Sequence, residues 1–438
     1  MDILKYLADE TSNIEYATSI LNTLRLQKFA QKTNIAKAAN IPWASAASLI
    51  DEMAKKNFVI DNSGENSNEK RKLLTVNPQV GYFIGVSVGT SHIKVAILDF
   101  NLNVVDKNYI KEKFKENQYE EDLLQQFGQN FSATHETKAQ WCIATPSANE
   151  SENSANLLEI KSILNYICDF STKLNACELK VFSICFSFPG HIDFRNNIIV
   201  ESSNFDFNFK NVGINNLFTS DILDKLHKQN TKIYLEHNVK AAAVAEIENI
   251  YDKNFSENMA IVYFGTGLGT SMILDSKLYR GSSNASGQIG HTHFITNVSS
   301  DICSCGRVGC LEQIIRNDVF SGIDIKTKTG EQLAKELLSR NDQRKKLVYY
   351  LSETIYNMVM LLEIDTIVFS GKLSEIYKVL ENEIQEQMIS NNISKLKIFP
   401  SPIGDYASSI GSAMCGYYRI LDIPFKWNRT IANTKADI

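Results

Sequence analysis

The first 78 residues carry apolar side chains at helical spacing. Residues 14–24 predict a first helix whose apolar face is formed by Ala17, Ile20, Leu21 and Leu24. Thr33 and Asn34 can cap a short second helix that ends at Asn40, and Pro42 opens a third. In the third helix the residues at i, i+3, i+4 and i+7 are apolar, which turns four side chains inward: Ala46, Leu49, Ile50 and Met53.

The outward face of the third helix and the residues after it predict a DNA-binding module. Ala44, Ala47, Ser48 and Asp51 point outward, as in a recognition helix. Residues 58–60, a polar turn and a basic run leading into residues 73–76 predict the two strands of a wing. We therefore predict a winged helix-turn-helix domain over residues 1–78, with DNA contacts from Ser45, Ala47, Ser48, Lys70, Arg71 and Lys72.

Charge gives this prediction limited support. Residues 20–60 contain six basic and two acidic side chains, but residues 1–78 contain ten basic and nine acidic ones. Contacts of the local cations with the DNA backbone would give salt-dependent binding. A helical protein-interaction module is the alternative, and Trp43 is compatible with packing as well as with a surface role.

From residue 82 the pattern changes to short β-rich runs separated by helical segments. Runs at 82–88 and 92–100 flank a Gly-Thr turn, and further runs follow at 181–188, 232–235, 259–264, 271–274 and 366–369. This alternation predicts a mixed α/β body. Part of the Asn-, Ser-, Gln- and Glu-rich stretch 117–156 is expected to be a mobile surface insertion.

Composition narrows the class of protein. The chain has 438 residues, of which 44% are apolar and 22% charged, so it can build two or three globular domains. The net charge of -5 excludes a general nucleic-acid coat protein but not one small DNA-binding module. No apolar run approaches the roughly 20 residues of a spanning helix, and no signal peptide is evident. We expect a soluble, cytoplasmic protein.

Two glycine-rich turns between β-rich runs are candidate phosphate-binding loops. A single such turn is weak support, but the pair, with Ser370-Gly371 after a third run, suggests a duplicated nucleotide-binding architecture with a cleft between two lobes. Backbone N–H groups could approach a phosphate at Gly85, Ser87, Gly89, Thr90, Gly265, Thr266, Gly267 and Gly269.

A metal site is the most specific signal in the chain. Three of the eight cysteines, Cys303, Cys305 and Cys310, fall within eight residues, and His291 precedes them. In a long chain without an export signal this crowding favours a metal over disulfides. A Cys₃His set suits structural zinc and leaves no ligand position open for water. Reduced structural cysteines are the alternative, and His293 is a rival to His291.

We call the segment 303–310, which contains the three clustered cysteines, the cysteine knuckle. An ordered set of motifs extends beyond it. It comprises the Gly-Thr turn at 89–90, Phe188-Pro189-Gly190, the helical run 238–246, Gly-Thr-Gly-Leu-Gly at 265–269, Gly-Gln-Ile-Gly-His at 287–291 and the cysteine knuckle with the Leu-Glu that follows it. Behind a winged helix, the set resembles the ROK family of repressors and sugar kinases over residues 15 to about 420. Within that family the chain is similar to the xylose-responsive and N-acetylglucosamine-responsive repressors.

The resemblance implies a two-lobe, actin-like ATPase fold of the α/β class, a zinc site from His291 and the three knuckle cysteines, and a sugar cleft. We expect the smaller lobe to comprise residues 79–204 and 405–438, and the larger lobe, with the knuckle, residues 205–404.

Three departures from the kinases of the family argue against phosphoryl transfer. The resemblance places Asn238 where those kinases carry the Asp that acts as general base, and an amide oxygen cannot usefully accept that proton. Ser87 replaces an acidic residue of the first phosphate turn, and Gln288 replaces a Glu. We expect no enzymatic activity and no bound ATP.

These three departures remove catalytic groups but leave the residues of a binding cleft in place. The resemblance implies that a sugar would contact Gly190, His191, Ser203, His237, Asn238, Gln288, His291 and Glu312. Individual residues have structural alternatives, since Asn238 can cap a helix and Glu312 can stabilise a first turn. We expect a sugar-responsive transcriptional regulator of carbohydrate metabolism, a repressor that binds operator DNA as a homodimer or a higher homo-oligomer. A sugar kinase for a hexose or N-acetylhexosamine is the alternative, and a regulator that answers to a protein partner is a third possibility.

Overall fold

A computed structural model of the 438-residue chain describes residues 14–63, 72–90, 92–105, 140–144, 153–202, 205, 209–250, 256–294, 301–393 and 395–423. The predicted contact residues Lys70, Arg71 and Ser203 lie outside these ranges, as does most of the predicted insertion at 117–156. The described part of that stretch forms strand β5 and the start of helix α7. In these ranges no helix combines the length and the apolarity needed to cross a membrane.

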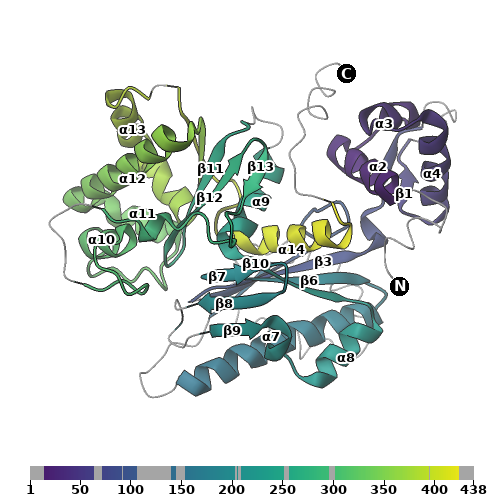
Figure 1. Ribbon diagram of the computed structural model, residues 1–438, viewed down its shortest axis with the longest axis horizontal. Coiled ribbons are helices and arrows are strands. Elements are labelled where there is room, and N and C mark those ends of the chain that lie inside the picture. The colour runs from purple at the N-terminus through teal and green to yellow at the C-terminus, as the bar shows by residue number, and fades with distance from the viewer. Residues whose placement is uncertain are drawn as a thin grey trace.

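The N-terminal domain consists of three helices and a two-stranded sheet (Figure 1): α2 (Ile14–Gln27), α3 (Lys32–Ala38), α4 (Trp43–Lys55), β1 (Val59–Asp61) and β2 (Leu74–Val76). The inward face predicted for α4 is confirmed, because Ala46, Leu49, Ile50 and Met53 are its buried residues. The predicted cap of the second helix is wrong. Thr33 and Asn34 lie inside α3, since the bridge between Ala30 and Leu74 ends the preceding segment earlier.

Two five-stranded sheets with the same topology form the body. The first has the order β10-β6-β3-β4-β5 and the second β15-β14-β11-β12-β13; in each, an antiparallel meander of three strands is extended by two parallel strands. The predicted duplication is therefore present in the strand order. The strands are β3 (Tyr82–Val88), β4 (His92–Leu98), β5 (Gln140–Ala144), β6 (Val181–Phe188), β10 (Lys232–His237), β11 (Met259–Phe264), β12 (Leu268–Leu274), β13 (Lys277–Tyr279), β14 (Thr366–Gly371) and β15 (Lys397–Pro400).

The change from the first sheet to the second falls after β10, near residue 238. The predicted lobe boundary at 204/205 does not coincide with it, because β10 hydrogen-bonds in parallel to β6 and thereby keeps residues 209–237 with the first sheet. This segment also contributes to a small antiparallel sheet of β7 (His191–Asp193), β8 (Ile198–Ser202) and β9 (Phe209–Gly213).

Helices cover both sheets, and two of them lie between the sheets (Figure 1). Helix α14 packs on β3 and β6, whereas α9 packs on β11 and β12 and crosses α14. The crossing is close at Gly411, where a Cβ atom would lie 1.7 Å from the carbonyl oxygen of Ala241. The helices of the body are α7 (Asn153–Ala176), α8 (Ser220–Lys228), α9 (Asn238–Ile250), α10 (Leu311–Asp318), α11 (Gly330–Leu338), α12 (Asn341–Leu362), α13 (Leu373–Ser390), α14 (Ala407–Ile420) and the 3₁₀ turns η2 (Pro78–Val80), η3 (Ile214–Leu217), η4 (Ile289–His291) and η5 (Gly404–Tyr406).

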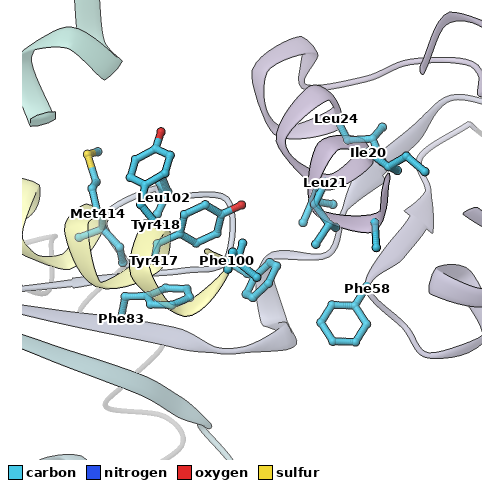
Figure 2. Close-up of a cluster of buried hydrophobic side chains, with 14 of the residues drawn as sticks. Ile20, Leu21, Leu24, Phe58, Phe83, Phe100, Leu102, Met414, Tyr417 and Tyr418 are labelled. Carbon is cyan, nitrogen blue, oxygen red and sulfur yellow. The ribbon is translucent and has the colours of Figure 1, made fainter. Parts of the chain in front are cut away.

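One apolar core runs from the N-terminal domain into the body (Figure 2). Phe100 connects the two parts: its ring centroid lies 5.8 Å from that of Phe58 and 5.7 Å from that of Tyr417 in α14. Both contacts are edge-to-face, the arrangement that aromatic rings prefer. The N-terminal domain is therefore packed against the C-terminal end of α14 rather than held by a linker alone.

Candidate functional site

A cleft of about 640 Å³ opens between the two sheets. Its walls come from corresponding turns of the duplicated sheets, from the junction of β10 with α9, and from the start of α10. Among the residues that line it are Ser87, Gly89, Thr90, Gly190, His191, His237, Asn238, Gly265, Thr266, Gly267, Gly269, Gln288, His291 and Glu312.

The two glycine-rich turns meet across the cleft. Thr90 follows β3 and Thr266 follows β11, so the two residues occupy equivalent positions in the two sheets, and their hydroxyl oxygens lie 2.7 Å apart. A hydrogen bond of this length joins the lobes directly. Gly85 is the one predicted loop residue that does not line the cleft, because it lies inside β3 and faces α14, where a Cβ atom would lie 1.9 Å from the carbonyl oxygen of Ser409.

The floor of the cleft is the junction between β10 and α9. His237 ends β10 and is buried, and its Nδ1 atom accepts a hydrogen bond from the N–H of Val239 at 3.3 Å. Burial, with the nearby Lys240 ammonium, lowers the pKa of His237 to about 3, so this imidazole is neutral at physiological pH. Asn238 begins α9, and its amide oxygen accepts from the same N–H at 2.9 Å.

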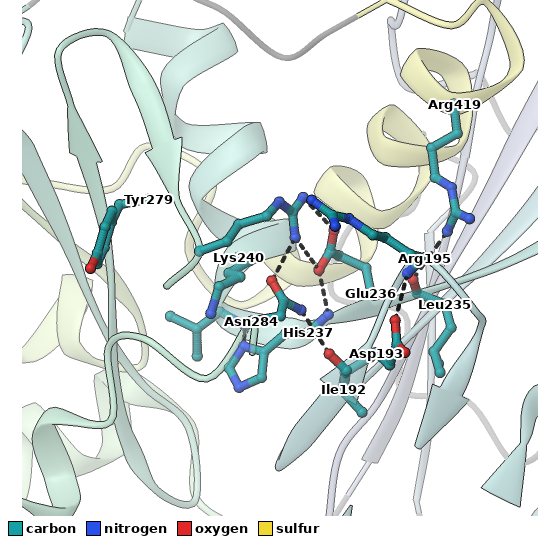
Figure 3. Close-up of polar contacts among 12 residues, drawn as sticks. Ile192, Asp193, Arg195, Leu235, Glu236, His237, Lys240, Tyr279, Asn284 and Arg419 are labelled. Carbon is teal, nitrogen blue, oxygen red and sulfur yellow. Dashed lines mark hydrogen bonds and ion pairs between the residues drawn. The ribbon is translucent and has the colours of Figure 1, made fainter. Parts of the chain in front are cut away.

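A partly buried ion pair joins the two lobes beside this floor (Figure 3). Arg280 follows β13 of the second sheet and places Nη2 2.7 Å from Oε2 of Glu236, which is in β10 of the first sheet. Burial opposes ionisation of Glu236, but Arg280 outweighs it and holds the pKa of this carboxyl below its usual range. Asn284 accepts from Arg280 and donates to the carbonyl of Ile192, which completes the network.

His191 takes part in the same lobe contact. Its Nε2 atom donates to the carbonyl oxygen of Ser283 at 2.7 Å. Gly190, directly before it, has φ of +103°, and a Cβ atom there would lie 2.4 Å from the carbonyl oxygen of Glu201. The tight turn that brings His191 to the cleft therefore requires glycine.

Glu312 presents its carboxylate from the first turn of α10. Oε2 accepts the N–H of Leu268 at 2.8 Å, and Oε1 lies 3.3 Å from Nη2 of Arg316. Arg316 also donates to the carbonyl oxygen of Thr266. Glu312 is thus fixed against the second glycine-rich turn and lines the cleft.

Four potential metal ligands converge at the edge of the cleft. The ligand atoms of His291, Cys303, Cys305 and Cys310 all lie within 4.8 Å of one another. The separations of 3.5 Å from Cys303 Sγ to His291 Nδ1 and from Cys305 Sγ to Cys310 Sγ match the edges of a tetrahedron around a metal bound at 2.0–2.3 Å. The predicted set is therefore present. Within the described part of the chain His293 does not belong to the group.

Several polar residues of the cleft were missed by the sequence analysis. Lys94, Lys372 and Asp405 line its other half, where the Nζ atom of Lys94 lies 3.4 Å from the Asp405 carboxylate. Lys372 is buried and donates to the carbonyl oxygen of Ile325 at 2.6 Å. Lys94 alternates with apolar neighbours in β4, a pattern that predicts only that its side chain points away from the core. Lys372 directly follows the Ser370-Gly371 turn, a signal that could have located it, whereas Asp405 adjoins a turn without a motif.

The predicted DNA contacts on α4 lie on its accessible side. Ser48 is exposed, and Ser45 and Ala47 are half-buried. Of the predicted contacts in the basic run before β2, Lys72 is described, and its Nζ atom lies 3.8 Å from the carboxylate of Asp61 in β1.

Comparison with known proteins gives the family. A family model described as the ROK family matches residues 145–416, which is more than half of the chain. The chain belongs to the ROK family. The matched residues include the β10–α9 junction, both halves of the lobe contact at Glu236 and Arg280, and the cysteine knuckle.

The relatives of this ROK chain include repressors that match nearly its whole length. The xylose repressor of Bacillus spizizenii is 22% identical over 436 residues, covering 95% of this chain and 99% of the repressor. The xylose repressor of Caldicellulosiruptor bescii is 26% identical over 300 residues, covering 67% of this chain, and the match spans only 61% of that repressor. The N-acetylmannosamine kinase of Pasteurella multocida is 29% identical, but over 149 residues that cover 32% of this chain and 49% of the kinase.

Solved structures agree on the fold. A crystal structure of a ROK family transcriptional regulator, a homolog of the E. coli MLC protein, matches 95% of this chain and 99% of its own, with a TM-score of 0.61 and 17% identity. A ROK family glucokinase from Streptomyces griseus in complex with glucose and AMPPNP matches 76% of this chain with a TM-score of 0.51. The two-lobe ROK fold predicted from the sequence is confirmed, and the kinase match omits about a quarter of the chain.

Proposed function

We propose that this ROK protein is a DNA-binding transcriptional repressor of carbohydrate metabolism genes that responds to a sugar or sugar phosphate. The N-terminal domain binds an operator, and the cleft between the sheets binds the effector. Similarity to xylose repressors over 95% of the chain supports this function, because it includes the N-terminal domain that a kinase does not need.

The observation that carries the proposal is the path of α9. Its first residue, Asn238, lines the cleft, and its last turn holds Glu248, which pairs with Arg25 of the N-terminal domain at 2.7 Å. A ligand that contacts Asn238 therefore acts on a helix whose other end is bonded to the DNA-binding domain. Two lobes that change their angle when the effector binds would change the spacing of two such domains in a dimer.

The cleft is proposed to bind without phosphoryl transfer. Asn238 has an amide where a kinase needs a base, and its oxygen is already an acceptor for the N–H of Val239. Ser87 and Gln288 also lack carboxylates. The sugar contacts we propose are Gly190, His191, His237, Asn238, Gln288, His291 and Glu312, which all line the cleft, together with Ser203, which lies outside the described residues.

Zinc is the metal that best suits the knuckle. Three thiolates and one imidazole lie close enough to coordinate one ion tetrahedrally, and they would fill every ligand position of a structural zinc site. Zinc bound there would hold the loop that carries His291 and would fix Cys310 two residues before Glu312. We infer a structural role, and a homodimer as the functional unit because paired half-sites multiply operator specificity.

The decisive experiment is a mobility shift of DNA upstream of the protein's own and neighbouring genes, at two salt concentrations, with and without candidate sugars. A sequence-specific, salt-sensitive shift that one sugar releases is the expected result. The absence of any specific shift would contradict DNA binding. ATP turnover with a panel of hexoses and N-acetylhexosamines, abolished by Glu312→Ala, would instead establish the kinase. A specific shift released by no sugar, with no heat in calorimetry against the same sugars, would favour a protein effector.

A further inference from the structure

The first nine residues of α4 contain none of the side chains that read guanine or adenine by paired hydrogen bonds. From residue 43 to residue 51 the helix has no Arg, Lys, Asn or Gln. Trp43 is 52% exposed, Ala44 and Ser48 are exposed, and Ser45 and Ala47 are half-buried. Arg and Lys recognise guanine, Asn and Gln recognise adenine, and apolar groups recognise the methyl group of thymine.

The two acidic side chains of α4 have local partners, whereas Lys55 in its last turn is exposed. The carboxylate of Asp51 pairs with the ammonium of Lys32 in α3, and Lys56, just beyond the helix, pairs with Glu52 at 2.6 Å. A carboxylate bound to Lys32 is a poor acceptor for the amino group of cytosine. Apart from the paired Asp51, the groups that residues 43–51 leave at the surface are an indole ring, two methyl groups and two hydroxyls.

We infer that α4 selects A·T pairs in the major groove through apolar contacts with thymine methyl groups, and that Trp43 makes the largest of these contacts. This inference rests on the proposed DNA binding and names the chemistry of the operator. Trp43 is the first residue of α4, and the N-terminal residues of a recognition helix are those that approach base edges. Ala44 and Ala47 are small enough to let the helix backbone approach the groove closely.

The N-terminal domain also contains exposed cations outside the first nine residues of α4. Lys28, Lys37 and Lys55 are exposed and belong to the α2–α3 connection, to α3 and to the last turn of α4. A face whose one carboxylate is paired, in a domain with exposed lysines, suits DNA, whose phosphates flank the groove, better than it suits a protein partner.

The inference is tested first by selection of duplexes from a random pool with the full-length protein. We expect half-sites dominated by A·T pairs. The selected duplex is then compared with one in which deoxyuridine replaces every thymidine, which removes the methyl groups and leaves base pairing and phosphates unchanged. At one salt concentration the affinity should fall about fourfold for each contacted methyl group.

Variants of Trp43 assign the contact. Trp43→Ala should weaken binding to the thymidine duplex and lower the ratio of the affinity for the thymidine duplex to that for the deoxyuridine duplex. Trp43→Phe should keep most of this ratio. Phe29→Ala is the matched control, because Phe29 is a 48% exposed aromatic residue of the same domain outside α4. It should leave the ratio of the two affinities unchanged.

The outcomes separate this inference from the proposed function. A selected site built on G·C pairs, or equal affinities for the two duplexes, would overturn the inference while DNA binding stands. An unchanged affinity ratio in Trp43→Ala would remove Trp43 from the contacts. Failure to enrich any sequence would overturn DNA recognition itself and would favour a protein partner for this face.

Discussion

Arg25 of the N-terminal domain and Glu248 of the ROK body form a buried ion pair, with Nη1 2.7 Å from Oε2 and side chains that are 7% and 8% exposed. Tyr418 of α14 joins them: its hydroxyl donates to Glu248 and lies 3.0 Å from Nη2 of Arg25. The pair connects residues that are 223 positions apart in the sequence. It connects the DNA-binding domain to the helix that begins in the cleft.

Removal of one partner should destabilise the domain contact strongly. Glu248→Ala leaves the Arg25 guanidinium buried without its carboxylate, and we expect the free energy of unfolding to fall by about 3 kcal/mol or more. Urea denaturation of the full chain measures the change. The matched control is Glu375→Ala, which breaks the exposed pair with Lys378 and should cost less than about 1 kcal/mol. Equal effects of the two changes would show that the Arg25–Glu248 contact is unimportant for stability.

Apolar replacement of both partners should separate DNA binding from the sugar response. Arg25→Met combined with Glu248→Leu avoids an unpaired buried charge, so the fold should persist, but the directional bond between α9 and α2 is lost. We expect the double variant to bind operator DNA and to resist release by the effector, as measured by mobility shift. Full release by the same effector concentration as in the unaltered protein would exclude this pair from the coupling.

Loss of one knuckle thiolate should reduce metal content and effector response together. Cys305→Ser removes one of four ligands, and the loop that holds His291 and precedes Glu312 loses its support. Zinc content by atomic spectroscopy and operator release by the effector are the two measurements. Cys177→Ser, in the cysteine that follows α7, is the control and should alter neither. A full response in a zinc-free Cys305→Ser protein would contradict the coupling.

Neutralisation of the basic run before β2 should flatten the salt dependence of operator binding. Each phosphate contact contributes about 0.9 to the slope of log K against log salt, so replacing Lys70, Arg71 and Lys72 with Ala should lower the slope by roughly 2 to 3. Replacement of the exposed Lys335, Lys345 and Lys346, in α11 and α12, removes the same charge far from the domain and should leave the slope unchanged. An unaltered slope in the first variant would exclude the run from the DNA contacts.

Glu246 should make the protein less stable as pH rises through neutrality. Burial raises the pKa of this carboxyl to about 7, although Ser370 and Ser401 donate to its Oε1. Because the folded state keeps the proton up to about pH 7 while the unfolded state releases it near pH 4.5, stability is greatest below pH 4.5 and is lost as pH rises through 7.

Glu246→Gln should remove this pH dependence of stability, because the amide does not titrate. Between about pH 5.5 and 8 we expect the variant to gain roughly 2 kcal/mol relative to the unaltered protein, as measured by urea denaturation across that range. A difference between the two proteins that does not change with pH would show that the Glu246 carboxyl titrates normally. Tyr263 is half-buried, and desolvation raises its pKa, so it does not ionise within this window.

The sequence by itself determined the elements whose patterns are local. The inward face of α4, the strands β3, β6 and β11, and the knuckle of His291 with three cysteines follow from spacing within short windows, and the structure agrees with each. Helical and strand periodicities depend only on which face of one element is buried, so a single segment contains the information. The duplication was evident for the same reason, because each copy repeats a local strand–turn–strand signal.

Only the tertiary structure decided which distant residues meet. The pairing of β10 with β6, which moves the lobe boundary, the contact of Thr90 with Thr266, the Glu236–Arg280 pair and the Arg25–Glu248 pair each join segments that no local pattern relates. Gly85 illustrates the limit: its turn motif predicted a cleft position, but the close approach of α14 explains why glycine is needed there. A charged residue on a helix looks the same in sequence whether it faces water or a partner, and only the packing of one element against another supplies that partner.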